Sequence, residues 1–250
     1  CTLFSWRHTG ERLKSFKDFS YKTWRKSAEN TGVQMVFSRD GGKTWDKTAR
    51  SVFPDWVCSA PVRQLPDGAC ILGLYGSDKE SGVEVGASSR STDRGQTWEP
   101  PVTIKAPPNV SLDAETDIIR LTDGRLYAAL RDSNKQRNMR FAISDDQGKS
   151  WGQAQDIRFP GHCPHLTRLS TGEILLSHRL PQTDLHISRD DAKTWQGSYR
   201  IDDVIGAYPA TVELKDGSVL IVYYTEGDDS HIRARRFKVN PTSIEFLPLS

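Results

Sequence analysis

The chain has 250 residues, enough for one large domain with a substantial core. Its formal net charge is only +2, from 34 basic and 32 acidic residues, so no overall field favours nucleic acid or an anionic membrane as a partner. Hydrophobic residues make up 36% of the chain, and no apolar run approaches the roughly eighteen residues of a membrane span. We therefore expect a globular protein without a membrane span, in which any recognition of charge is local.

The four cysteines, Cys1, Cys58, Cys70 and Cys163, lack both the close spacing of a zinc site and the density of a disulfide framework. They therefore indicate neither a metal site nor a compartment. The opening residues, from Cys1 to Trp6, are apolar and aromatic like the middle of a β-strand, without the charged leader and cleavage site of a signal peptide. We expect that the natural chain begins earlier.

An eight-residue motif recurs four times, with Ser, Asp, Gly, Thr or Ser, and Trp at fixed offsets. The copies end at Trp45, Trp98, Trp151 and Trp195, and the fourth has Ala192 where the others have Gly. Successive tryptophans are 53, 53 and 44 residues apart. This period is typical of propeller blades of about 40 to 50 residues.

Each copy follows a short apolar strand pattern, as at Val33 to Phe37 and Arg140 to Ile143, and precedes another extended stretch. The motif therefore predicts the turn of a hairpin. Its Asp and Ser side chains can accept hydrogen bonds from backbone N–H groups, its Gly can take a positive φ, and its Trp can pack against a neighbouring hairpin. Because the motif lacks the ligand series of an EF-hand, we expect it to be structural rather than a calcium site.

A second hairpin alternates with the first. It joins two apolar strands through Asp-Gly between Val62 and Leu72 and between Ile118 and Tyr127, and Leu166 to Leu176 and Val212 to Val222 repeat the pattern. Two hairpins in each repeat make one four-stranded sheet, and no stretch has sustained helical periodicity. The sequence thus predicts an all-β fold, a β-propeller that forms a single domain.

The predicted blades cover residues 1–54, 55–105, 106–158, 159–201 and 202–250, and the first of them is incomplete. A propeller closes on itself because an open arc would leave unpaired strand edges. We therefore expect the missing strands to lie before Cys1.

The order of motifs and hairpins resembles the Asp-box (BNR-repeat) sialidases over essentially the whole chain. The resemblance implies a six-bladed β-propeller with its substrate site at the central axis. The same box also occurs in sortilin-like receptors, in photosystem assembly factors and in other glycosidases, so the function has to be argued from other residues.

One such match lies between Asp113 and Ser133, which is similar to the sialidase stretch where a Glu opens the innermost strand and an Arg closes the next strand sixteen residues later. Here these residues are Glu115 and Arg131. Strand, tight turn and strand return the chain beside its starting point, so we expect both at one rim of the hairpin. A salt bridge without a catalytic role is the alternative.

The segment that begins at Gly206 resembles the sialidase segment whose Tyr is the nucleophile. Tyr208 lies thirteen residues after Trp195, as in that family. Pro209 departs from the small polar residue that commonly follows the nucleophile, and a packed strand tyrosine is the alternative. Arg179, which closes the second strand of the preceding blade, resembles another substrate-binding arginine of the family.

The residues that the resemblance assigns suit the chemistry of sialic acid, which carries a carboxylate on its anomeric carbon. Guanidinium groups can grip that carboxylate, as expected of Arg131 and Arg179, and the family's remaining arginine would precede Cys1. A neutral phenol approaches such a centre without charge repulsion but needs a base, for which Glu115 is the candidate. Asp18 is the one candidate for the general acid in this chain, unless that Asp also lies upstream.

The sequence from His162 to His165 offers His and Cys side chains of the kinds that bind zinc. We expect no metal here. In an innermost strand the two histidines point to opposite faces, so that His162 can face the channel and contact the substrate.

We therefore predict an exo-acting, retaining glycoside hydrolase of the sialidase type without a cofactor, acting on a glycan or glycoconjugate. Tyr208 is the expected nucleophile, Glu115 its base, and Arg131, Arg179 and His162 contact the substrate. Two alternatives stay open: a hydrolase for another sugar, and a propeller that binds glycans or proteins without catalysis. The resemblance favours a secreted or periplasmic location, and the sequence leaves the oligomeric state open.

Overall fold

The computed structural model describes residues 2–8, 28–77, 82–112, 115–134, 138–226 and 230–249, with side chains from residue 32 onward. Asp18 lies outside these residues. Every regular element in the described ranges is a β-strand, as the sequence predicts. In this part of the chain there is no helix that could cross a membrane.

The strands form five antiparallel sheets. The first sheet consists of β1 (Thr2–His8), β2 (Ala28–Met35) and β3 (Arg50–Phe53). The second consists of β4 (Trp56–Val57), β6 (Cys70–Ser77), β7 (Glu84–Ser91) and β8 (Val102–Ile104), and β5 (Arg63–Gln64) also pairs with β6.

The other three sheets have four strands each. The third contains β9 (Thr116–Arg120), β10 (Leu126–Leu130), β11 (Asn138–Ser144) and β12 (Gln155–Pro160). The fourth contains β13 (His162–Arg168), β14 (Ile174–Arg179), β15 (Thr183–Ser188) and β16 (Gln196–Asp202). The fifth contains β17 (Ala207–Glu213), β18 (Val219–Tyr224), β19 (Ile232–Val239) and β20 (Ile244–Leu247).

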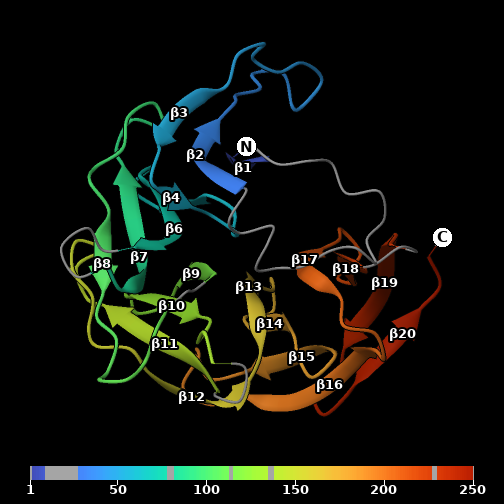
Figure 1. Ribbon diagram of the computed structural model, residues 1–250. Helices are drawn as coiled ribbons and strands as arrows, with labels where there is room; N and C mark the ends of the chain where they lie inside the picture. The colour runs from blue at the N-terminus through green and yellow to red at the C-terminus, as the bar shows by residue number, and fades with distance from the viewer. Residues whose placement is uncertain are drawn as a thin grey trace.

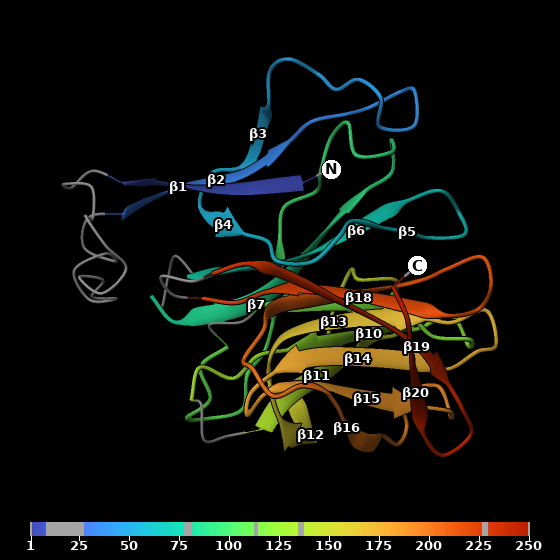
Figure 2. The same ribbon diagram turned by 90° about the vertical axis from the view of Figure 1, so that its right-hand side faces the viewer.

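The sheets follow one another around a common middle, as Figure 1 shows. In the fourth sheet, strands β13 to β16 succeed one another from the middle to the periphery in both Figure 1 and the perpendicular view of Figure 2. Strand β13 contacts β9 on one side and β17 on the other. The first residues of these three innermost strands therefore come from separate parts of the sequence and meet near the axis.

The ends of the sheets differ slightly from the predicted blade boundaries. Strand β12 continues to Pro160, two residues beyond the predicted boundary at 158, and β16 continues to Asp202, one residue beyond 201. In β12 the extra length arises because Pro160 pairs with Asn138 across a register shift, which continues the ladder past the expected end.

The four boxes form the hairpin turns that the sequence predicts. In the second box, Asp93 Oδ1 accepts a hydrogen bond from Thr97 N at 2.8 Å, and Ser91 Oγ accepts one from Gly95 N at 2.7 Å. The boxes of Asp40, Asp146 and Asp190 make the same bonds. Ala192 takes the glycine's place at a φ of +65°, so this turn keeps its geometry at the cost of some strain.

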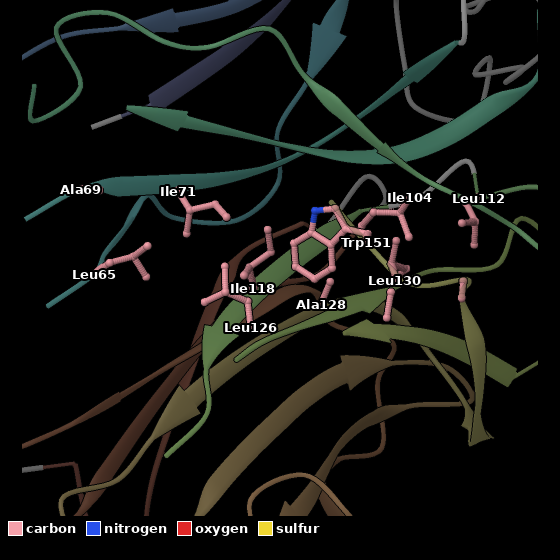
Figure 3. Packing of buried hydrophobic residues seen from close by; sticks show 12 residues of the cluster. Leu65, Ala69, Ile71, Ile104, Leu112, Ile118, Leu126, Ala128, Leu130 and Trp151 are labelled. Atoms are coloured by element: carbon pink, nitrogen blue, oxygen red, sulfur yellow. The ribbon is translucent and has the colours of Figure 1, made fainter. Parts of the chain in front are cut away.

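Box tryptophans join neighbouring sheets. Trp151 donates from Nε1 to Ser88 Oγ of β7 at 2.8 Å and packs in the core between the second and third sheets, which Figure 3 shows. Trp195 packs likewise against Tyr127 and Phe159 of the third sheet. Burying such side chains contributes about 2 kcal/mol or more each, so Trp151 and Trp195 help to hold neighbouring sheets together, whereas Trp45 is 48% exposed.

Candidate functional site

Four inner hairpins close with the same backbone hydrogen bond. In each of them a Leu donates its N–H to the carbonyl oxygen four residues on, at 2.7 to 2.8 Å. These residues are Leu65, Leu121, Leu169 and Leu214. Positions counted from these leucines are therefore structurally equivalent between repeats.

Six residues before each of these leucines is a residue at or near the start of the first strand of the inner hairpin. These residues are Ser59, Glu115, Cys163 and Tyr208. Sixteen residues further on, at the end of the second strand, lie Tyr75, Arg131, Arg179 and Tyr224. Four of the five predicted site residues, all except His162, thus occupy equivalent positions in three successive repeats.

Two of these innermost strands begin with a bulge. Tyr208 has a φ of +48° and Cys163 a φ of +54°, values that L-residues rarely adopt, and the register of β17 and β13 shifts at these points. Such backbone costs about 1–3 kcal/mol at each residue and re-aims the side chain relative to a regular strand. The bulges turn both residues toward the same carboxylate.

That carboxylate belongs to Glu115, which is 2% exposed. Its Oε1 accepts from Arg131 Nη1 at 2.8 Å, from the Tyr208 hydroxyl at 3.4 Å and from Cys163 Sγ at 3.5 Å. Its Oε2 accepts from the backbone N–H of Cys163 at 3.3 Å. The predicted base and nucleophile therefore lie side by side although 93 residues separate them.

The phenol of Tyr208 is neutral at ordinary pH. Burial, followed by the negative charge of Glu115, holds its pKa far above the usual range for a tyrosine. The ring stacks on Tyr224 with centroids 6.2 Å apart and an interplanar angle of 19°. A phenol held in this way can lose its proton only to an adjacent acceptor, and the Glu115 carboxylate is in that position.

Arg179 lies over the same ring, with its Cζ 5.9 Å from the centroid of Tyr208. Its Nη1 is 3.3 Å from Oε1 of Glu226, an exposed carboxylate. Its Nε is buried and has no hydrogen-bond partner among the described residues. With Arg131, it places a second guanidinium beside the Glu115–Tyr208 pair, which suits an anionic ligand.

The structure places His162 differently from the simple alternation expected of a strand. It is 3% exposed and pairs with Arg179 in the ladder, and the next regular pair is His165 with Ser177. The bulge at Cys163 interrupts the alternation between the two histidines, so it is Cys163 that contacts Glu115. Within the described part of the chain, no three His, Cys, Asp or Glu side chains are grouped to hold a metal ion.

Three residues near the site escaped the sequence analysis. Cys163 contacts Glu115, Tyr224 stacks on Tyr208, and Glu226 pairs with Arg179. Counting back from the hairpin leucines would have found Cys163 and Tyr224, because they share positions with Glu115 and Arg131. No comparable signal marks Glu226, which follows the end of β18.

The carboxylate of a second charged pair lies in β9, two residues after Glu115. Asp117 is fully buried and accepts from Arg63 Nη2 at 2.5 Å and Nε at 3.2 Å. It also accepts from the backbone N–H groups of Leu166 and Ile118, both at 2.7 Å. This pair links strands β5, β9 and β13 and supports the site above it.

Comparison with known proteins places the chain among BNR-repeat proteins. The model of the BNR repeat-like domain family matches residues 4–221. A sialidase from Micromonospora viridifaciens is 26% identical over 219 residues, which are 76% of this chain and 33% of that protein. The chain thus spans about a third of the length of that curated relative.

Solved structures share the fold at low sequence identity. A protein of unknown function from Dyadobacter fermentans has a TM-score of 0.72 at 19% identity, covering 99% of this chain and 72% of that one. A sialidase from Streptococcus pneumoniae has a TM-score of 0.65 at 18% identity, over 89% and 37% of the two chains. The intramolecular trans-sialidase from Ruminococcus gnavus, in complex with oseltamivir carboxylate, has a TM-score of 0.63 at 20% identity, over 85% and 51%.

Proposed function

We propose, since the chain belongs to the family of BNR repeat-like domains, that it is a sialidase-type exo-glycoside hydrolase releasing terminal sialic acid or a related acidic sugar from glycans. One observation carries the proposal. The Tyr208 hydroxyl lies 3.4 Å from Glu115 Oε1, which also accepts a bond from Arg131 at 2.8 Å, and the Arg179 guanidinium lies over the tyrosine ring.

The fold that would carry this activity is, in our proposal, a six-bladed propeller. On one face of the fifth sheet the side chains of Val212, Val222, Tyr224 and Ile232 are exposed by 52, 37, 39 and 78%. Cross-strand pairing places them on the same face. A blade normally packs both faces against its neighbours, and a further blade over this face would bury these side chains.

The proposed reaction has two displacements at the anomeric carbon. In the first, Tyr208 Oη bonds to that carbon, its proton passes to Glu115, and the bond to the leaving oxygen breaks as a general acid protonates that oxygen. In the second, the general acid, now in its base form, takes a proton from water, whose oxygen bonds to the anomeric carbon as the bond to Tyr208 Oη breaks. Tyr208 recovers its proton from Glu115, and the sugar keeps its configuration. Asp18 remains our prediction for the acid, outside the described residues.

The two arginines would serve the substrate rather than the nucleophile. Arg131 is 20% exposed and Arg179 17% exposed at the side chain, so each has a surface that a ligand can reach. A sialic acid carboxylate would take charge-assisted hydrogen bonds from the exposed parts of both guanidinium groups. His162, the ladder partner of Arg179, stays our prediction for a further substrate contact, although its side chain is buried.

The test is turnover of a fluorogenic sialoside by the full-length natural protein and by Tyr208→Phe, which removes one oxygen atom from the ring. We expect turnover to fall by about 10³-fold or more, because the nucleophile is lost. Tyr199→Phe is the matched control, since Tyr199 lies in β16 and its hydroxyl bonds only weakly, to Thr242 O at 3.4 Å. It should keep full turnover.

Equal turnover by the natural protein and Tyr208→Phe would end the assignment of the nucleophile. Turnover of another acidic glycoside, but not of sialosides, would favour a hydrolase for another sugar. Binding of a sialoside without turnover of any glycoside would favour the propeller without catalysis.

A further inference from the structure

Cys163 occupies in the fourth sheet the position that Glu115 has in the third and Tyr208 in the fifth. All three lie six residues before the Leu that closes the inner hairpin. Cys163 and Tyr208 also share the left-handed backbone, and a proline follows each of them. Cys163 therefore holds the same position in its repeat as Glu115 and Tyr208 do in theirs, and its sheet lies between their two sheets in sequence order.

The contacts of Cys163 reach both oxygens of one carboxylate. Its backbone N–H donates to Glu115 Oε2 at 3.3 Å, and its thiol donates to Glu115 Oε1 at 3.5 Å. Oε1 is also the oxygen that faces the Tyr208 hydroxyl. In a regular extended strand the backbone N–H and the side chain of one residue point in different directions. The φ of +54° at Cys163 lets its N–H and its thiol both donate to Glu115.

The thiol is suited to donate rather than to react. Cys163 is 2% exposed, and burial, followed by the charge of Glu115, holds its pKa well above the usual range for a cysteine. It therefore keeps its proton and gives a weak S–H donor next to an acceptor. A buried protonated thiol of this kind is a poor nucleophile and a poor target for oxidation.

From these contacts we propose that Cys163 is a positioning residue of the site, which holds the Glu115 carboxylate through both oxygens and so aims Oε1 at the Tyr208 hydroxyl. The catalytic role of Cys163 rests on the proposed function, whereas its hydrogen bond to Glu115 can be tested without any activity. Positioning matters because a small displacement of a base from its proton costs far more rate than binding.

The first test compares kcat and KM of Cys163→Ala and Cys163→Ser. The alanine variant keeps the backbone donor and loses the thiol, so we expect kcat to fall about tenfold, the worth of one hydrogen bond, with KM within about twofold. The serine variant keeps a donor, and we expect it to recover kcat to within about threefold of the natural protein. Cys70→Ala, at a buried cysteine of β6, is the matched control and should leave both constants unchanged.

Two outcomes of that test overturn the proposal. One is an unchanged kcat in Cys163→Ala. The other is an equal loss in the alanine and serine variants, which would make volume or packing the reason.

The second test needs no activity. The S–H stretching band of Cys163, identified in the Raman spectrum by its loss in Cys163→Ser, should lie lower in wavenumber than that of Cys70, because a donating thiol has a weaker S–H bond. Glu115→Gln should move it upward, since the acceptor loses its charge. A Cys163 band that Glu115→Gln leaves in place would contradict the inference. If the natural protein turns over no sialoside but the band moves, the proposed function fails while the hydrogen bond stands.

Discussion

Two layers of charged side chains lie along the axis, and they are built differently. In the deeper layer, Asp117 is fully buried and accepts four hydrogen bonds, three of them between 2.5 and 2.7 Å. In the outer layer, Glu115 has one bond of 2.8 Å and three between 3.3 and 3.5 Å. Both carboxylates accept from a donor at each of these contacts, but the contacts of Asp117 are mostly shorter, and Oε1 of Glu115 is shared by a guanidinium, a phenol and a thiol.

This difference separates the roles of the two carboxylates. Asp117 joins strands β5, β9 and β13 through four hydrogen bonds. In our proposal Glu115 exchanges a proton with Tyr208, and strained backbone at Cys163 and Tyr208 keeps both residues beside its carboxylate. The hydrogen bonds of the deep layer thus hold the strands that carry the proposed site.

Among the variants that test the difference between Glu115 and Asp117, we expect Glu115→Gln to have the largest effect, on turnover. The amide keeps the shape but cannot accept the phenolic proton, so turnover of a sialoside should fall by about 10²- to 10⁴-fold. The free energy of unfolding should change little, because among the described residues the one donor to Oε2, where the amide nitrogen can sit, is the Cys163 N–H at 3.3 Å. Steady-state kinetics together with thermal unfolding check both halves. A variant that loses its fold instead would place Glu115 with Asp117 as a structural residue.

The matched change in the deeper layer is Asp117→Asn. Whichever way the amide is turned, its nitrogen meets a donor from Arg63 and a backbone N–H, so we expect the free energy of unfolding to fall by about 3 kcal/mol and Tm by roughly 6–12 °C. Asp203→Ala, at a carboxylate whose side chain is 88% exposed, should change it by less than about 1 kcal/mol. Equal stability of Asp117→Asn and the natural protein would show that the deep layer does not hold the strands.

A smaller effect is expected at the rim. Arg179→Lys keeps a positive charge but loses the planar fork, so KM for a sialoside should rise about tenfold with little change in Tm. The exposed Arg200→Lys is the control and should leave KM as it is. An unchanged KM in Arg179→Lys would remove Arg179 from the substrate contacts.

The sequence predicts the repeats better than the site because turns are local. Asp93 and Gly95 determine a hairpin through contacts within a few residues, so the strand order follows from the motif. The spacing of Glu115 and Arg131 is also local, and the two form the expected pair. That Tyr208 meets Glu115 is implied by family resemblance alone, since their contact depends on how sheets pack around an axis.

The bulges are what sequence reasoning does not provide. No residue type near Cys163 indicates that its backbone is left-handed. The alternation of a regular strand predicts instead that His162 faces the channel. A repeat alignment anchored on the hairpin leucines identifies the position of Cys163, but only the backbone shows where the thiol points.

The smallest effect concerns the boxes, at the periphery. A hydrogen bond from the Thr97 hydroxyl, above all, lowers the pKa of Asp93 from 3.8 to about 2. Because this folded-state pKa lies below the unfolded value, the carboxylate stabilises the fold above about pH 4, and that stability is lost as the pH falls from about 4 to about 2. Thr97→Val should move the pKa of Asp93 back toward its usual value in a carboxyl NMR titration, while Thr103→Val, at a threonine of β8 outside the box, should not. An unmoved pKa in Thr97→Val would refute the assigned cause.

The most direct measurement uses a sialosyl fluoride that carries a second fluorine beside the anomeric carbon, which slows the hydrolysis of a glycosylated enzyme. Attack by Tyr208 Oη expels fluoride and passes the phenolic proton to Glu115, so mass spectrometry of the digested protein should find the sugar on the peptide that contains Tyr208. The same peptide of Tyr208→Phe should remain unlabelled. Label on another residue, or none while the natural protein still hydrolyses sialosides, would contradict the account.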